Sequence, residues 1–183
     1  MATFVSRAGF KLEHALKVFA PDVTGTTCAD LGSNVGGFVD CLLQHGAAKI
    51  YALETGYGVL DYKLRKDPRV VVMERTNAMH ATLPELVDLI TIDVAWTKQK
   101  RILPAARKML KPDGRVITLI KPHYESPPNL LVKGILPPEH LPAVMEQVKS
   151  DIATSGFELI DITDSPITGA GGNRELLAIL RIP

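Results

Sequence analysis

A strand, a glycine-rich turn and a helix follow one another near the start of this chain. The run TCADLG (27–32) has the composition of a buried strand, and GGFVDCLLQHG (36–46) that of a helix closed by Gly46. The run AKIYALE (48–54) then indicates a second strand. Parallel strands need a long crossover such as this helix, so the segment predicts a βαβ unit at the heart of a parallel sheet.

The rest of the chain continues this alternation. Near-continuous apolar runs are typical of strands that are covered on both faces by helices. Further strands are predicted at 69–75, 88–93 and 114–122, and further helices near 59–66, 99–111 and 138–154.

The last two strand-like runs differ from the others because a short segment joins them. FELIDITD (157–164) and ELLAILRI (175–182) flank SPITGAGGNR, which predicts an antiparallel hairpin. Seven strands ending in an antiparallel pair are typical of a class I, Rossmann-like methyltransferase sheet. We therefore predict one domain over residues 1–183, with a seven-stranded, mostly parallel sheet, an antiparallel last strand and helices on both faces.

The segment before the first strand predicts an additional N-terminal helix. Apolar residues recur at helical spacing up to Leu16 and Phe19, which indicates an amphipathic helix over about 6–19. Ser6 is a plausible N-cap and Pro21 ends the pattern.

Composition limits the classes of protein that this chain can belong to. Its 183 residues are 46% hydrophobic and 22% charged, as in a single globular domain. The net charge is only +1, so an anionic partner would have to bind to a local basic patch and not to the overall field of the protein. Cys28 and Cys41 make no disulfide framework and are expected to be buried, as in a reducing cytoplasm. Charges interrupt the first 20 residues, and no run reaches the roughly 18 apolar residues of a membrane span. We expect a cytoplasmic protein without a membrane partner, monomeric or weakly oligomeric.

The glycine-rich turn predicts a nucleotide-like ligand at a helix N-terminus. Ser33 and Asn34 stand between Gly32 and Gly36, which departs from the G-x-G-x-x-G spacing of NAD sites and favours S-adenosyl-L-methionine. Glu54, at the end of the second predicted strand, can accept hydrogen bonds from the ribose hydroxyls of the donor. Asn77, after the third predicted strand, is placed to meet the adenine. The predicted donor site comprises Asp30, Gly32, Ser33, Asn34, Gly36, Gly37, Phe38, Glu54, Asn77 and Asp93. Alternatively, the glycines make a tight turn and Glu54 faces solvent.

Four charged residues, Lys11, Asp93, Lys121 and Glu175, stand at positions where the predicted fold brings them together. Asp93 and Lys121 end parallel strands, and Glu175 begins an antiparallel one, so all three are expected at one edge of the sheet. Lys11 joins them if the N-terminal helix docks its apolar stripe on the sheet. The alternative is that Lys11 and Glu175 are solvated and Asp93 caps a helix.

Phrases along nearly the whole chain resemble one family of enzymes. SRAGFKLEHAL, DLGSNVGGFVDCLLQHGA, LETGYGVL, ERTNAM, LIKPHYE and SPITGAGGNRELL are similar, in order and spacing, to FtsJ-type ribose 2′-O-methyltransferases, closest to the TlyA or haemolysin-A-like branch. The resemblance implies transfer of a methyl group to RNA, expected to be ribosomal RNA or a ribosomal subunit, with S-adenosyl-L-homocysteine as product and no metal. It also assigns Lys11, Asp93, Lys121 and Glu175 to a catalytic K-D-K-E tetrad.

The chain departs from that branch in three places. The branch usually has Asp in place of Glu54, Ser-Phe in place of Ala95-Trp96, and Gln-Phe in place of His123-Tyr124. It also usually carries an N-terminal S4-type RNA-binding domain, whereas this chain begins shortly before Lys11. We therefore expect weaker substrate binding or another segment in its place.

The tetrad leaves two roles open for Lys121. Burial and a second cation such as Lys11 favour a neutral lysine that acts as the base, whereas Asp93 and Glu175 work against it. If Lys121 stays charged, its second possible role is chiefly to hold the ribose hydroxyl in line with the methyl group.

A substrate groove is less clearly predicted. Arg7 and Arg174 flank tetrad residues and are candidates for phosphate contacts. Trp96 and Tyr124 either stack on an unpaired base or pack internally, and His123 is expected to be a loop histidine. The loop 122–138 is long enough to close over a substrate. A basic stretch either contacts phosphates or forms a solvated helix face: Lys98, Lys100, Arg101, Arg107, Lys108 and Lys111.

Two other functions remain open from the sequence. One is an inactive or weakly active RNA-binding module of the same fold, because the residues after Asp93 and Lys121 are altered. The other is a methyltransferase whose acceptor is not RNA.

Overall fold

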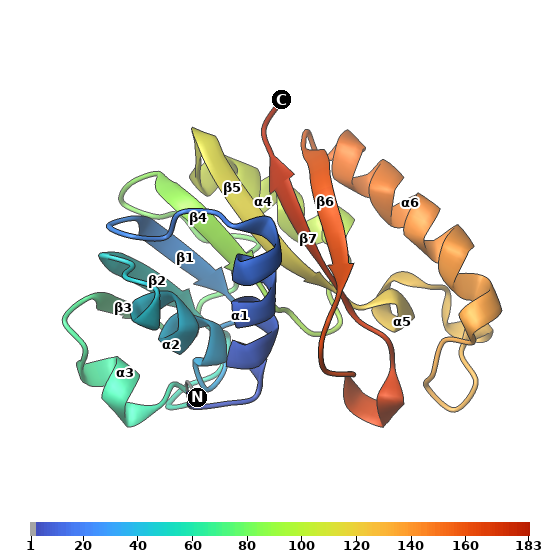
Figure 1. The fold of residues 1–183 in the computed structure, drawn as a ribbon, viewed down its shortest axis with the longest axis horizontal. Helices are drawn as coiled ribbons and strands as arrows, with labels where there is room; N and C mark the ends of the chain where they lie inside the picture. Colours follow the sequence, from blue (N-terminus) through green and yellow to red (C-terminus); the bar gives the residue numbers. More distant parts are fainter. Residues whose placement is uncertain (1–2) are drawn as a thin grey trace.

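The computed structural model describes residues 3–183, which surround one seven-stranded sheet in the order β3-β2-β1-β4-β5-β7-β6 (Figure 1). Strand β7 pairs antiparallel with both β5 and β6, and the other pairings are parallel. The predicted seven-stranded, mostly parallel sheet and its C-terminal hairpin are confirmed. The strands are β1 (Thr27–Leu31), β2 (Lys49–Leu53), β3 (Val70–Met73), β4 (Val87–Ile92), β5 (Leu110–Ile120), β6 (Glu158–Asp164) and β7 (Leu176–Arg181).

Strand order reverses direction at β1. The chain runs outward from β1 through β2 to β3 and then returns to the other side of β1 as β4. Loops that leave β1 and β4 at their carboxyl ends therefore diverge, and in open α/β sheets ligands bind in the crevice between such loops.

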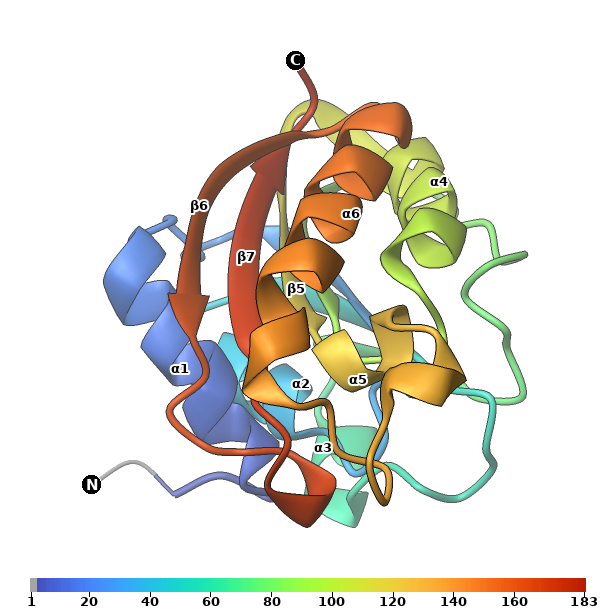
Figure 2. The same cartoon turned by 90° about the vertical axis from the view of Figure 1, so that its right-hand side faces the viewer.

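Helices cover both faces of the sheet, as predicted. Helices α1 (Ala8–Phe19) and α2 (Gly37–Gln44) pack against one face, and α4 (Gln99–Met109) and α6 (Leu141–Thr154) against the other (Figure 2). Successive strand residues point to opposite faces, so in β4 buried Leu89 belongs to the core under α1 and α2, whereas Ile90 belongs to that under α4 and α6. Burial on both sides explains the apolar runs of the central strands, whereas β6 at the sheet edge is largely exposed.

The N-terminal helix begins later than predicted. It starts at Ala8 after Arg7, which makes no side-chain capping bond, so the prediction of Ser6 as N-cap is wrong. The Ser6 hydroxyl instead packs against Gly37, in the space that a side chain at position 37 would need. The start of α1 therefore lies directly against the start of α2. The helix ends at Phe19 because Ala20 adopts a left-handed conformation with φ of 48°.

Other boundaries differ from the predictions for local reasons. Helix α3 (Tyr62–Lys66) begins where the Asp61 side chain accepts from the Lys63 amide, and not at residue 59. Residues 138–140, following Pro137, form a 3₁₀ turn before α6. The predicted loop 122–138 begins with a further short helix, α5 (Pro122–Glu125), in which Pro122 occupies the first turn. No helix in residues 3–183 combines the length and apolarity needed to cross a bilayer.

Candidate active site

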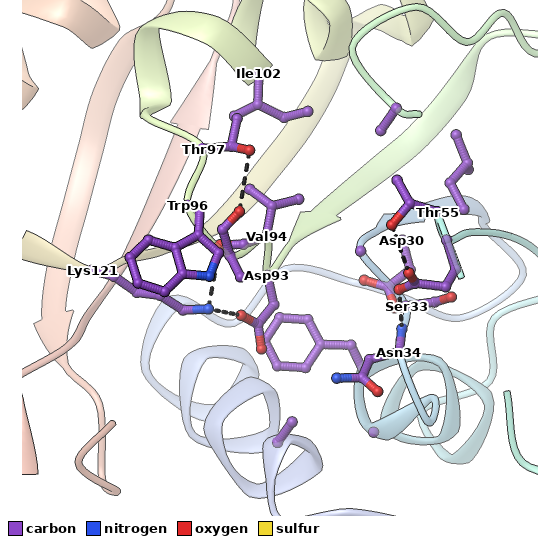
Figure 3. Close-up of a pocket in the computed structure, with 18 of the residues that line it drawn as sticks. Asp30, Ser33, Asn34, Thr55, Asp93, Val94, Trp96, Thr97, Ile102 and Lys121 are labelled. Atoms are coloured by element: carbon purple, nitrogen blue, oxygen red, sulfur yellow. Dashed lines mark hydrogen bonds and ion pairs between the residues drawn. The ribbon is translucent and has the colours of Figure 1, made fainter. Parts of the chain in front are cut away.

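A cavity of about 730 Å³ opens at the carboxyl ends of the parallel strands. Its wall comes from the start of α1, the loop after β1, the ends of β2, β4 and β5, and the segment before β7. Figure 3 shows Asp30, Ser33 and Asn34 on one side of it, and Asp93 and Lys121 on the other. The cavity therefore spans the point where strand order reverses.

All but one of the residues predicted for the donor site and the tetrad line this cavity. The exception is Gly36, which does not line the cavity. It packs against the Leu60 and Leu64 side chains, which a Cβ at this position would meet. The residues on the wall are Lys11, Asp30, Gly32, Ser33, Asn34, Gly37, Phe38, Glu54, Asn77, Asp93, Lys121 and Glu175.

The loop after β1 is held tightly between its neighbouring strands. The amides of Gly32 and Ser33 both donate to the Leu53 carbonyl at 2.9 Å, which fixes the loop to the end of β2. Gly32 has φ of +87°, and a Cβ there would stand 2.6 Å from the backbone oxygen of Asp93. A side chain at this position would push the end of β1 away from the end of β4, so glycine is required.

Gly32→Ala is expected to destabilise the protein by about 2 kcal/mol or more, because a left-handed alanine is strained and its Cβ displaces backbone. Gly25→Ala is the matched control, since Gly25 has φ of +71° but no atom within 4 Å of its Cβ position. Urea unfolding of both variants measures the difference. Equal losses in the two proteins would contradict the requirement for close approach at Gly32.

Three buried polar atoms on the wall have no hydrogen-bond partner among the described residues, and two of them belong to Asp30 and Ser33 at the end of β1. Asp30 Oδ1 accepts from Thr91 Oγ1 at 2.7 Å, whereas Asp30 Oδ2 and Ser33 Oγ are unpaired. Burial raises the pKa of Asp30 to about 7, and the Asp93 and Glu54 carboxylates add to this rise. Unsatisfied buried groups are costly, so their position in this wall indicates a polar ligand.

Glu54 and Asn77 have defined positions at the ends of their strands. Glu54 Oε2 accepts from the Asn34 amide at 3.0 Å, and Oε1 from the Gly56 amide at 2.8 Å. Glu54 therefore lies on the cavity wall and is partly buried, so the alternative in which it simply faces solvent is not what the structure shows. Asn77 Oδ1 accepts from the Met79 amide, which leaves its side-chain NH₂ group for other partners.

The four charged residues form two ion pairs in the cavity. Lys11 pairs with Glu175, and both side chains are buried although they are 164 positions apart. Lys121 Nζ lies 2.6 Å from Asp93 Oδ1 and 3.3 Å from the Val94 carbonyl oxygen. The alternative in which Lys11 and Glu175 are solvated is therefore wrong. Docking of α1 through Leu12 and Leu16 places Lys11 at the sheet edge, as the apolar stripe predicted.

His123 is buried in the cavity wall, which its sequence position did not indicate. It lies in α5 with 7% exposure and lines the cavity, and its Nδ1 has no partner among the described residues. Burial lowers the pKa of His123, Glu175 opposes this, and Lys121 adds to it. The expectation of a loop histidine is thus wrong. The proline that follows Lys121 was the available signal, since proline favours the first turn of a helix.

Buried hydrogen bonds fix α5 against the start of α4. Glu125 is buried and its Oε1 accepts from the Gln99 amide at 2.9 Å, while Lys98 Nζ donates to the Glu125 carbonyl at 2.7 Å. Burial raises the pKa of Glu125 to about 7, against the lowering effect of the Gln99 hydrogen bond. These contacts give the segment after Lys121 a defined position, so it is not an open loop.

An aromatic pair stands at the mouth of the cavity. The Trp96 and Tyr124 ring centroids are 4.6 Å apart with an interplanar angle of 32°, and Trp96 is 83% exposed. Lys121 Nζ lies 5.8 Å from the Tyr124 centroid. Trp96 therefore does not pack into the core, although it does contact Tyr124.

Half of the eight predicted basic contacts have partners within the chain, including Lys98 described above. Lys111 pairs with Asp88, and Arg107 donates to the Gly156 carbonyl. Arg174 pairs with Asp164 at 2.6 Å. Arg7 is exposed and lines the cavity, so its location fits a phosphate contact better than that of the stretch 98–111.

Comparison with known proteins gives close relatives over nearly the whole chain. A Bacillus subtilis (strain 168) protein provisionally named the rRNA methyltransferase YqxC is 41% identical over 186 residues, covering 98% of this chain and 66% of its own length. A Mycobacterium tuberculosis (strain CDC 1551 / Oshkosh) protein named 16S/23S rRNA (cytidine-2′-O)-methyltransferase TlyA is 38% identical over 97% of this chain and 68% of its own length. The chain thus spans about two thirds of the length of these curated relatives.

Solved structures agree with this relationship. A Streptococcus thermophilus protein provisionally named a hemolysin superposes with a TM-score of 0.95 at 37% identity, over 98% of this chain and 67% of that one. An S-adenosylmethionine dependent methyltransferase from Mesorhizobium loti, 18% identical, superposes with a TM-score of 0.67 over 92% of this chain and 96% of that one, and shares the fold alone. The predicted methyltransferase fold is confirmed.

The family model for FtsJ-like methyltransferases matches residues 4–182, which include the cavity and both ion pairs. Because this match extends over almost the entire chain and agrees with relatives of about 40% identity, the chain belongs to the FtsJ-like methyltransferase family.

Proposed function

We propose that this protein transfers a methyl group from S-adenosyl-L-methionine to a ribose 2′-hydroxyl of RNA, in ribosomal RNA. The observation that carries the proposal is the convergence of the Lys11–Glu175 and Lys121–Asp93 pairs on the cavity that the glycine loop borders. The name of the Mycobacterium relative, an rRNA (cytidine-2′-O)-methyltransferase, supports the choice of acceptor.

The residues around the β1 loop fit the donor. S-adenosyl-L-methionine supplies an activated methyl group on a sulfonium, together with an ammonium, a carboxylate and an adenosine. Asp30 Oδ2 is an unpaired acceptor for a cation, and Glu54 is placed for the ribose hydroxyls. Asn77 offers its NH₂ group to adenine, while Gly32 keeps the loop free of a Cβ that would fill the site.

Lys121 is placed to hold the acceptor oxygen. An ammonium group has three N–H donors, of which one faces Asp93 and one faces the Val94 carbonyl. The third is free to donate to a ribose oxygen and keep it in line with the methyl carbon. The hydroxyl loses its proton as the oxygen–carbon bond forms and the carbon–sulfur bond breaks, and Asp93, the carboxylate that pairs with Lys121, would receive it. The buried Lys11–Glu175 pair lines the same cavity.

The aromatic pair fits an acceptor that lies in an unpaired strand. Trp96 has an exposed ring face beside Lys121, and stacking on such a face is how proteins commonly hold unpaired RNA bases. Arg7, on the cavity wall, is available for the neighbouring phosphate.

The test is transfer of labelled methyl groups from S-adenosyl-L-methionine to total ribosomal RNA and to isolated ribosomal subunits, with mapping of the product nucleotide. We expect label on a ribose. Donor binding without label on any RNA would favour an inactive RNA-binding module or a non-RNA acceptor.

Donor affinity is expected to increase with pH up to about neutrality. The pKa of Asp30 is raised to about 7, so below that pH the folded protein holds a proton on Asp30 that binding of a cationic donor must displace. We expect affinity to fall by up to about tenfold per pH unit below 7 and to level off above it. Calorimetric titration between pH 5.5 and 8.5, at about unit spacing, measures this. Asp30→Asn, which has no such proton, should bind weakly at every pH, and an unchanged slope in that variant would contradict the role of Asp30.

A further inference from the structure

Two tyrosines beside the cavity are largely open to solvent. Tyr57, in the loop between β2 and α3, is 71% exposed, and Tyr62, the first residue of α3, is 65% exposed. Figure 1 shows this segment next to β3, at the edge of the molecule. A planar group from a partner therefore has access to both rings.

Each tyrosine carries a cation over its ring. Arg75 Cζ lies 4.3 Å from the Tyr57 centroid, and Lys66 Nζ lies 4.3 Å from the Tyr62 centroid. Neither Arg75 nor Lys66 forms an ion pair with any carboxylate in residues 3–183, whereas nearby Arg65 is paired with Glu74. These two positive charges are thus available to an anionic partner.

The backbone holds Arg75 in a costly conformation beside Tyr57. Arg75 has φ of 52°, in the left-handed region that non-glycine residues rarely adopt. Its amide donates to the Gly56 carbonyl at 3.1 Å, which ties it to the residue before Tyr57. The main chain of Arg75 is therefore held beside the Tyr57 loop, and its guanidinium lies over the Tyr57 ring.

The surface continues into the cavity. Thr55 and Val59, on either side of Tyr57 in the chain, line the cavity wall, as does Thr76, which follows Arg75. Tyr62 follows Asp61, whose amide donates at 3.0 Å to the carbonyl of Val35, another residue of the wall. A ligand that reaches the cavity along this side therefore meets the segment that carries both rings.

We propose that Tyr57, Tyr62, Lys66 and Arg75, here called the Tyr57–Tyr62 surface, bind the single-stranded RNA segment that flanks the acceptor nucleotide. Alternating aromatic rings and unpaired cations suit a strand whose bases stack and whose phosphates face the cations. A duplex does not fit, because its base faces are covered. This inference rests on the proposed function for the identity of the acceptor, but its test does not depend on catalysis.

The experiment measures binding of a fluorescent single-stranded RNA of about 12 nucleotides by anisotropy, with a duplex of equal length as comparison. Tyr57→Ala and Tyr62→Ala are each expected to weaken single-strand binding by about 5- to 100-fold, while S-adenosyl-L-methionine affinity stays at the wild-type value. Tyr57→Phe and Tyr62→Phe are the matched variants, which keep the ring and should bind as the wild type does. Duplex binding should be equal in all five proteins.

The outcomes separate this surface from the proposed function. Weakened RNA binding in the alanine variants supports the surface even if no methyl transfer is detected, in which case the proposed function alone fails. Wild-type RNA binding by both alanine variants overturns the surface, as does equal weakening in the phenylalanine variants. Absence of single-strand binding by the wild-type chain also overturns it and points to a protein partner.

Discussion

Lys121→Ala should lower the rate of methyl transfer at least about 10²-fold while donor affinity remains unchanged. Orientation and proton transfer each contribute on this scale, and the lysine is held for the task by Asp93 at 2.6 Å and the Val94 carbonyl at 3.3 Å. Single-turnover transfer of labelled methyl to ribosomal RNA gives the rate, and calorimetry gives the donor affinity.

Lys17→Ala provides the matched control for this variant. Lys17 lies on α1 and pairs with Glu13 one turn away, outside the cavity. Its removal deletes the same charge from the protein and should leave the rate within about twofold, since exposed pairs contribute little. Full activity in Lys121→Ala would exclude the assignment of Lys121.

Lys11→Met is expected to destabilise the folded state by about 3 to 5 kcal/mol, the usual cost of leaving one partner of a buried ion pair uncompensated. Lys11 and Glu175 are 6% and 4% exposed, so the remaining carboxylate has little access to water. For a domain of this size the melting temperature should fall on the order of 10 °C. Thermal unfolding followed by circular dichroism measures this.

The double variant Lys11→Met, Glu175→Leu separates stability from activity. Replacing both members of a buried pair by apolar groups often restores stability, so this protein should melt near the wild-type temperature. Methyl transfer should nevertheless remain low, because neither side chain can then orient the reacting groups. Recovery of both properties together would mean that the pair serves folding alone.

The fold could be predicted from the sequence because each strand is short, apolar and bounded by turn residues. The alternation of strands and helices gave the sheet, and the hairpin of β6 and β7 followed from its short connection. Element boundaries were less predictable. Ser6 has the chemistry of a cap, but packing against Gly37 determines where its hydroxyl lies.

Positions at the sheet edge could also be predicted, but side-chain environments could not. Asp93 and Lys121 follow strand ends, so topology alone brings them to one edge. The burial of His123 depends on how α5 packs beside α6, which no local pattern encodes. The partners of Arg107 and Arg174 are likewise tertiary, so a run of basic residues did not reveal which charges are available.

The insertion of β7 between β5 and β6 has a consequence for biosynthesis. Lys11 comes from the first helix, whereas Glu175 immediately precedes the last strand, 164 positions later. During translation the chain emerges from its amino end, so β5 keeps an open edge, and Lys11 stays without its carboxylate, until Glu175 and β7 leave the ribosome. A nascent chain that has not yet reached β7 therefore lacks the complete constellation, so a competent site requires that β7 has been synthesised and inserted into the sheet.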